Sequence, residues 1–146
     1  SLELEGMTVF TKNCSTCHQG ELFTDHSFRN NGLYPLSRND TGRFGITGQE
    51  KALYKFKVPS LRNVAYTAPY MHDGRYKTLD EVLEHYTSNV QNLATLDDLL
   101  KKENGKTGIA LTKQESVALK AFLESLSDEQ FIKNPQFKDP GIGNAL

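Results

Sequence analysis

Residues 14–18 of the chain read Cys-Ser-Thr-Cys-His, and this stretch contains its only two cysteines. A redox-active Cys-x-x-Cys pair usually begins a helix after a strand in a β-α-β pattern, and no such pattern surrounds this pair. A structural zinc site needs two further ligands at a second spaced pair. The other histidines, His26, His72 and His85, stand alone without that spacing. The sequence therefore argues against a redox disulfide and against a zinc site.

The remaining use of this spacing is the covalent attachment of haem c. Thioether bonds at Cys14 and Cys17 would fix the vinyl groups of the ring, and the adjacent His18 would bind the iron. Every chemically active residue of the motif then has a role. We predict one covalent haem c, with Cys14 and Cys17 as attachment points and His18 as the proximal iron ligand.

Length and composition limit the other possibilities. The 146 residues suffice for one domain with a core, so we expect a single domain over residues 1–146. A formal charge of −1 offers no basic surface for nucleic acid. No stretch approaches the roughly 20 consecutive apolar residues of a membrane span. Because the chain begins with Ser1, we expect it to be part of a longer sequence.

Two helices are predicted near the ends of the chain. Residues 2–12 carry several apolar side chains, and Gly6 among them would let another helix approach closely. Residues 112–126 begin with a capping box formed by Thr112 and Glu115. The buried face of this second helix is predicted to contain Leu119, Phe122, Leu123 and Leu126.

A further helix is predicted over residues 78–86, where Thr78 and Glu81 form another capping box. The spacing of its large side chains predicts an inward face made of Leu79, Val82, Leu83 and Tyr86. His85 lies about 100° further round the helix, so we expect its side chain on the flank and partly solvated.

Much of the remaining chain is predicted to be loop. Residues 19–58 are rich in Gly, Asn, Asp and Thr and show no sustained period, which indicates an extended loop over the haem. A short helix is predicted around Leu96 to Lys102. The expected fold is an all-α, cytochrome c-like domain with long loops wrapped round one covalent haem.

Several motifs in one order make the chain resemble a known family. The motifs are CSTCH (14–18), TGRFGITG (41–48), FKVPSLRNVAYTAPYMHDG (56–74), TLDEVLEHY (78–86) and LSDEQFIKNPQFKDP (126–140). Together they resemble the C-terminal haem domain of bacterial di-haem cytochrome c peroxidases and their MauG-like relatives. The resemblance extends over roughly residues 4–140.

This resemblance implies a function. In that family, one cytochrome c-like domain carries the haem that reacts with peroxide, and the C-terminal domain carries an electron-transfer haem. The chain would then be the second half of a larger di-haem oxidoreductase, exchanging electrons with a second haem centre and not reacting with peroxide itself. The alternative is a stand-alone monohaem c carrier or haem-binding module that docks on a separate redox protein. A third possibility is a single haem with peroxidase activity of its own.

The sixth iron ligand stays open at this point. The peroxidases use a Met in the helix that follows the P-Y-x-H-x-G segment, and the corresponding position here is Tyr86; MauG-like members use Tyr there. The predicted inward face of the helix also favours Tyr86. Met71 in the loop APYMHDG is the rival ligand, and His26 is the next candidate if neither binds.

Four other residues have predicted supporting roles. Arg62 and His72 are polar groups among apolar ones, which suggests that they contact the haem propionates, although an Arg paired with an ordinary carboxylate is the alternative. The family resemblance also implies a calcium ion bound partly by the backbone carbonyls of Thr67 and Pro69. A further calcium ligand would come from the other domain. Calcium needs six to eight oxygen ligands.

The expected location follows from the cofactor. Bacteria attach haem c covalently outside the cytoplasmic membrane, so we expect a periplasmic protein or one otherwise outside that membrane. The expected partner is a second haem domain or another redox protein.

Overall fold

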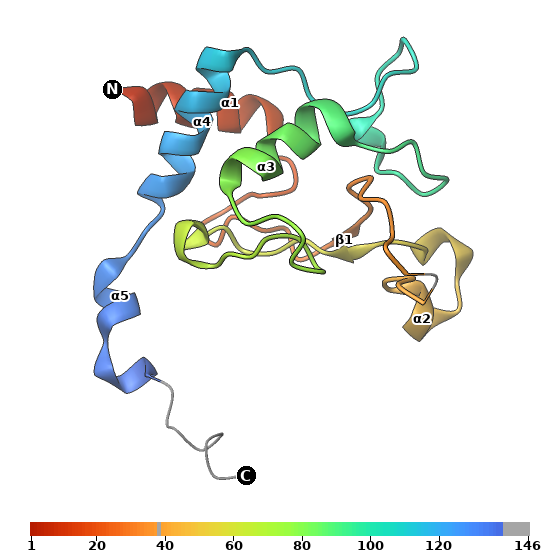
Figure 1. Ribbon diagram of the computed structural model, residues 1–146, viewed down its shortest axis with the longest axis horizontal. Coiled ribbons are helices and arrows are strands. Elements are labelled where there is room, and N and C mark those ends of the chain that lie inside the picture. Colours follow the sequence, from red (N-terminus) through yellow and green to blue (C-terminus); the bar gives the residue numbers. More distant parts are fainter. Residues whose placement is uncertain (38, 139–146) are drawn as a thin grey trace.

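Three helices form the core of the protein: α1 (Leu2–Asn13), α3 (Leu79–Glu84) and α4 (Lys113–Ser125). The computed structural model describes residues 1–37 and 39–138. In Figure 1, α1 and α4 cross at one end of the molecule and α3 lies beside them. Loops with short helical turns connect these helices and contain most of the predicted site residues.

The crossing of α1 and α4 depends on Gly6, which is buried. The two backbones are so close that a β-carbon at this position would collide with the carbonyl of Ala118. Only a glycine allows this approach. The close approach predicted at Gly6 is therefore confirmed, and it sets the position of the helix that leads into the Cys-x-x-Cys-His motif.

Helix α4 has the predicted capping box. The Glu115 amide donates to Thr112 Oγ1 (3.1 Å), and the Thr112 amide donates to Glu115 Oε2 (2.7 Å). The predicted apolar face is also confirmed, because Leu119, Phe122 and Leu123 are buried and Leu126 packs against the core.

The main hydrophobic cluster joins α1, α3, α4 and η2 (Val64–Tyr66). Its buried members are Val9, Phe10, Val64, Leu79, Leu83, Leu119, Phe122 and Leu123. The rings of Phe10 and Phe122 lie 5.0 Å apart, and Phe23 meets Phe10 edge-on at 5.7 Å. Cys14 packs against this cluster. The core thus directly supports the C-terminal end of α1, where the motif begins.

Helix α3 begins with the capping box predicted at Thr78 and Glu81 and continues into the π-helical turn η3 (His85–Asn89). His85 is only 1% exposed, so the prediction of a partly solvated side chain was wrong. The helix wheel considers one helix in isolation, whereas here the loop at Asn31 and the ring of Tyr76 cover this flank. The next residue, Tyr86, is half-buried.

Residues 19–58 contain more structure than the predicted loop. β1 (Phe28–Arg29) pairs antiparallel with β2 (Phe56–Lys57), and Phe28 faces Lys57 in the register. The turns α2 (Phe44–Thr47) and η1 (Glu50–Ala52) lie between the strands. The fold therefore has helices and one small sheet, which the all-α prediction did not include. Strands of two residues are too short to give a readable period.

Short elements also complete the second half of the chain. The helix expected around residues 96–102 is the 3-10 turn η4 (Asp98–Leu100), capped by the side chain of Asp97. After α4, α5 (Glu129–Lys133) and η5 (Pro135–Phe137) extend away from the core in Figure 1. The last two residues of the segment 126–140 lie outside the described residues, as does the end of the predicted domain 1–146. None of the helices described has the length and apolar character needed to cross a membrane.

Candidate haem site

The Cys-x-x-Cys-His motif forms a turn at the end of α1. The Cys14 amide donates to the Phe10 carbonyl (2.8 Å), which continues the hydrogen-bonding pattern of the helix. The amides of Cys17 and His18 both donate to the Cys14 carbonyl, at 3.2 and 2.9 Å. The three predicted haem-binding side chains are therefore held close together by their own backbone.

A hydrogen bond to the Phe23 carbonyl orients the imidazole of His18. Its Nδ1 lies 3.0 Å from the carbonyl oxygen of Phe23, and a carbonyl can only accept. Nδ1 therefore carries the proton and Nε2 keeps its lone pair, which is the arrangement of a histidine prepared to bind a metal. Burial lowers the pKa of His18, while the carbonyls of Phe23 and Pro59, which can both accept from a protonated ring, oppose this shift. The neutral ring is the form that binds a metal.

The two thiols are free and protonated at neutral pH. Burial raises the pKa of Cys14 to about 12, and the nearby Cys17 adds to this shift. Burial also raises the pKa of Cys17, against the opposing charge of Arg29. Thiols with raised pKa values are poor nucleophiles in thiol–disulfide exchange. These values weigh against a redox-active pair and agree with cysteines that serve as attachment points.

The two candidate distal ligands meet at one side chain that the sequence analysis did not single out. The Asn31 Nδ2 lies 3.4 Å from Tyr86 Oη and 3.5 Å from Met71 Sδ. Burial raises the pKa of Tyr86, the Asn31 hydrogen bond lowers it, and the charges of Cys14 and Cys17 raise it further. Nothing in the local pattern around Asn31 indicates this contact, because residues 31, 71 and 86 come together only in the folded chain.

Met71 occupies an unusual backbone conformation. Its φ angle is +70°, in the left-handed region that residues with a β-carbon rarely adopt. Such positions are frequent where a loop is shaped for binding. The loop of Met71 therefore has a strained backbone at the residue that contacts Asn31. His26, the next candidate ligand, also has a positive φ (57°) in its own loop.

His85 holds the backbone of Asn31, the residue that contacts both candidate ligands. Its Nε2 donates to the Asn31 carbonyl (3.0 Å), and its Nδ1 accepts from the Tyr76 hydroxyl (3.4 Å). Burial lowers the pKa of His85, although the Asn31 carbonyl opposes this shift. The histidine is thus a neutral, buried group whose two ring nitrogens are both used.

An ion-pair network lies on the side of Cys17 and was also missed from the sequence. Arg29 Nη2 and Nη1 contact Asp25 Oδ2 (2.8 Å) and Asp97 Oδ2 (2.9 Å). Burial raises the pKa of Asp25, but hydrogen bonds from Ser27 and Arg29 outweigh it and lower the pKa to about 2. Hydrogen bonds to Asp25 and Asp97 raise the pKa of Arg29. The network ties β1 to the turn before η4.

The residues predicted to contact the haem propionates have other partners in the structure. Arg62 Nε donates to the Glu21 carbonyl (2.8 Å). His72 Nε2 lies 2.7 Å from Asp40 Oδ2, and its ring stacks on Phe56 with centroids 3.5 Å apart. The structure therefore gives each of the two residues a defined orientation through its own partners.

The residues predicted to bind calcium lie in the loop between η2 and α3. Thr67 Oγ1 donates to the Val64 carbonyl (3.1 Å), and the Tyr70 hydroxyl donates to the same oxygen (2.9 Å). Pro69 lies between them in the sequence. These contacts order the loop, and they involve the side chain of Thr67 rather than the carbonyl expected to bind calcium.

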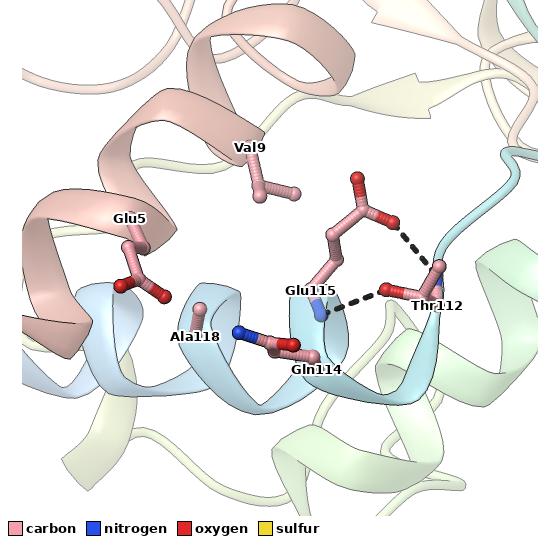
Figure 2. A pocket seen from close by; sticks show the side chains of 6 residues that line it. All are labelled: Glu5, Val9, Thr112, Gln114, Glu115 and Ala118. Carbon is pink, nitrogen blue, oxygen red and sulfur yellow. Dashed lines mark hydrogen bonds between the residues drawn. The ribbon is translucent and has the colours of Figure 1, made fainter.

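A pocket lies in the groove where α1 crosses α4. Figure 2 shows Glu5 and Val9 on one side and Thr112, Gln114, Glu115 and Ala118 on the other. The dashed lines are the two hydrogen bonds of the α4 capping box. The polar groups of Thr112 and Glu115 are therefore used to cap a helix, and the groove contains none of the predicted haem-binding residues.

The residues of the motif fit a covalently bound haem, because two adjacent thiols accompany a histidine whose Nε2 is left to bind iron. The family model of cytochrome c matches residues 4–127 of the chain. The chain belongs to the cytochrome c family. The predicted resemblance to the peroxidase and MauG-like branch of this family is also confirmed by the named relatives of the domain.

Two relatives illustrate this branch. The domain is 34% identical over 126 residues to the methylamine utilization protein MauG of Methylorubrum extorquens. It is 33% identical over 157 residues to the cytochrome-c peroxidase IdrP1 of Denitromonas iodatirespirans. These matches cover 85% and 88% of the domain but only 34% and 40% of the relatives. The domain thus spans about two fifths or less of the length of these proteins.

A solved structure agrees with the fold. The domain matches a MauG-like protein associated with microbial copper homeostasis with a TM-score of 0.77 and 34% sequence identity. The match covers 96% of the domain and 51% of that protein. The cytochrome c fold described above is therefore found in a protein of the same branch.

Proposed function

We propose that this cytochrome c domain carries one covalent haem c and exchanges electrons with a second haem centre of a di-haem cytochrome c peroxidase or MauG-like protein. The proposal includes a location outside the cytoplasmic membrane, where bacteria attach haem c. It also assigns the reaction with peroxide to another domain, as the family resemblance implies.

One observation carries this proposal. His18 is held by the Phe23 carbonyl so that its Nε2 is left to bind iron, directly beside two protonated, unpaired cysteines. When bound, a haem c would supply one-electron chemistry, its iron alternating between two oxidation states. The domain would contribute the attachment points, the fixed proximal histidine and a largely apolar surrounding from Phe10, Phe23 and the core.

We assign the distal position to Tyr86. Its phenol lies beside Asn31, and the family resemblance places a Tyr at this position in MauG-like members. An anionic oxygen ligand favours the oxidised iron and lowers the reduction potential, whereas a thioether raises it. A domain with Tyr86 as the ligand would favour storing oxidising equivalents.

Other residues keep their predicted roles as proposals. Arg62 and His72 are assigned to the haem propionates, since both are oriented cations or potential cations in the loops that would surround the ring. The carbonyls of Thr67 and Pro69 are assigned to a calcium ion that would be completed by oxygen ligands from the other domain.

Electron exchange without peroxide turnover tests the proposed function. The haem-loaded domain should be reduced and reoxidised reversibly by small redox mediators, and its steady-state turnover of hydrogen peroxide should be negligible. Rapid turnover of peroxide by the domain alone would instead support the view that its single haem is itself peroxidatic.

Two matched substitutions test the distal assignment. Tyr86→Phe keeps the ring and removes the ligand oxygen, so it should abolish the phenolate-to-iron absorption and raise the reduction potential. Met71→Leu approximates the volume of Met without its sulfur and should change little. The opposite pair of results, with a weak long-wavelength sulfur-to-iron band in the wild type, would identify Met71 as the ligand.

A further inference from the structure

We propose that the carboxamide of Asn31 is a positioning group that selects the distal iron ligand, by donating to Tyr86 in preference to Met71. This inference rests on the proposed function, because it presupposes a haem attached at Cys14 and Cys17. It goes further in that it names the residue that decides between two ligands present in the same site.

The position of Asn31 makes such a selection possible. Its amide nitrogen carries two hydrogens, and it lies 3.4 Å from Tyr86 Oη and 3.5 Å from Met71 Sδ. The contact with oxygen is longer than an ordinary N–H···O bond, so the phenol is not yet firmly held. The carboxamide therefore touches both candidates, and the stronger acceptor can draw it to one side.

The surroundings of the carboxamide determine which of its two ends faces the candidate ligands. Asn31 Oδ1 accepts a hydrogen bond from the Leu33 amide (3.3 Å), so the nitrogen must face Tyr86 and Met71. The Asn31 carbonyl accepts from His85 Nε2 (3.0 Å), and His85 in turn accepts from the Tyr76 hydroxyl. This chain of contacts explains why a histidine is buried behind the site: it anchors the backbone that presents the carboxamide.

The two acceptors differ in strength. A thioether sulfur is a weak acceptor, whereas an oxygen that carries negative charge accepts hydrogen bonds about twice as strong as those between neutral groups. A phenol oxygen has a second lone pair with which it can bind iron while it accepts from Asn31. The carboxamide therefore favours Tyr86 whenever the phenol oxygen is the charged ligand, and it gives Met71 little support.

The test uses substitutions at Asn31 in the haem-loaded domain. Asn31→Asp keeps the acceptor for the Leu33 amide but replaces both N–H groups with a carboxylate that repels a charged phenol oxygen. The ratio of phenolate-ligated to thioether-ligated or open iron should fall at least about tenfold, as expected for the loss of one hydrogen bond to a charged group. The ratio is read from the absorption and electron paramagnetic resonance spectra of the oxidised protein. Asn31→Ala, which removes both N–H donors and introduces no new one, gives the second measurement if Asn31→Asp does not fold.

The neighbouring residue provides a matched control. Asn30 lies in the same turn, but its Nδ2 donates to Thr95 Oγ1 (2.9 Å) and its Oδ1 accepts from the Gly32 amide (2.8 Å). Asn30→Asp should lower stability and leave the ligand spectrum unchanged. If it shifts the ligand as much as Asn31→Asp does, then loosening of the turn is the cause and the inference is overturned.

Tyr86→Phe separates this inference from the proposed function. If Tyr86→Phe removes the phenolate spectrum but neither Asn31 variant changes it, Asn31 does not select the ligand, while the assignment of Tyr86 stands. If Tyr86→Phe leaves the wild-type spectrum unchanged, the assignment of Tyr86 and the selection by Asn31 both fail. Covalent haem attachment at Cys14 and Cys17 is unaffected by either result.

Discussion

The two sides of the candidate haem site are built in different ways. On the proximal side, Cys14, Cys17 and His18 belong to one turn, and short backbone hydrogen bonds hold them at the end of α1. On the distal side, Tyr86 and Met71 come from separate segments, and the Asn31 carboxamide contacts both of them at 3.4 and 3.5 Å. The proximal side is determined locally, whereas the distal side depends on the whole fold.

This difference has a functional consequence. A ligand fixed by its own turn is present whenever the turn is formed, so attachment of the haem should tolerate changes elsewhere in the domain. A ligand that depends on three separate segments can be exchanged by small changes in any of them. We therefore expect substitutions on the distal side to tune the reduction potential and those on the proximal side to abolish the native centre.

His18→Ala should have the largest effect. Covalent attachment at Cys14 and Cys17 should remain possible, but the native low-spin spectrum should be lost completely because no other residue of the turn can replace the imidazole. Absorption spectra of the oxidised and reduced protein measure this. A spectrum identical to the wild type would remove His18 from its assigned role and would break the contrast between the two sides.

Gly6→Leu should have the next largest effect, because it separates α1 from α4 and so disturbs the support of the proximal turn. The side chain would collide with the backbone at Ala118, and we expect a loss of about 3 kcal/mol or more in the free energy of unfolding. Urea denaturation measures the loss. Gly105→Ala is the control, since that glycine has a positive φ but no neighbouring atom within 4 Å. It should cost about 1 kcal/mol. Equal losses at the two positions would contradict the packing argument.

Acid should lower the stability of the fold near Cys17, because Asp25 takes up a proton there. The pKa of this carboxyl is lowered in the folded protein from 3.8 to about 2, so the unfolded chain takes up its proton first as the pH falls. The resulting stabilisation, about 2 kcal/mol, is complete above pH 4 and is lost between about pH 4 and pH 2. Asp25→Asn should be less stable at neutral pH and should lose stability less steeply in acid. Parallel acid unfolding curves for the two proteins would contradict the assignment.

The smallest effect is expected at the helix caps, where two equivalent capping boxes can be compared. Thr78→Ala and Thr112→Ala each remove a capping-box hydroxyl and should each cost about 1 kcal/mol. Only Thr78 begins the helix that leads to Tyr86, so only Thr78→Ala should change the distal ligand spectrum. Thermal unfolding and absorption spectra of both variants measure this. If both variants alter the spectrum, or if neither does, the claim that the helix beginning at Thr78 supports the distal ligand is wrong.

The features that could be predicted from the sequence are the locally encoded ones. The Cys-x-x-Cys-His motif, the capping boxes at Thr78 and Thr112 and the close approach at Gly6 each depend on residues a few positions apart. The inward face of α4 follows from its helical period in the same way.

The features that could not be predicted depend on contacts between distant residues. The burial of His85 results from the loop at Asn31, which lies 54 positions earlier in the sequence. Arg29 pairs with Asp97 across 68 positions, and Asn31 reaches Met71 and Tyr86 across 40 and 55. A helix wheel or a motif has no access to such contacts, and two-residue strands leave no period to detect.

The most direct test of the account is whether the polypeptide keeps its haem after denaturation. The protein purified from cells able to attach haem c should retain one haem per chain in acid or on a denaturing gel, because thioether bonds at Cys14 and Cys17 do not dissociate. The variant with both cysteines replaced by Ser should lose it under the same conditions. A colourless denatured wild-type chain would contradict the haem c assignment and everything derived from it.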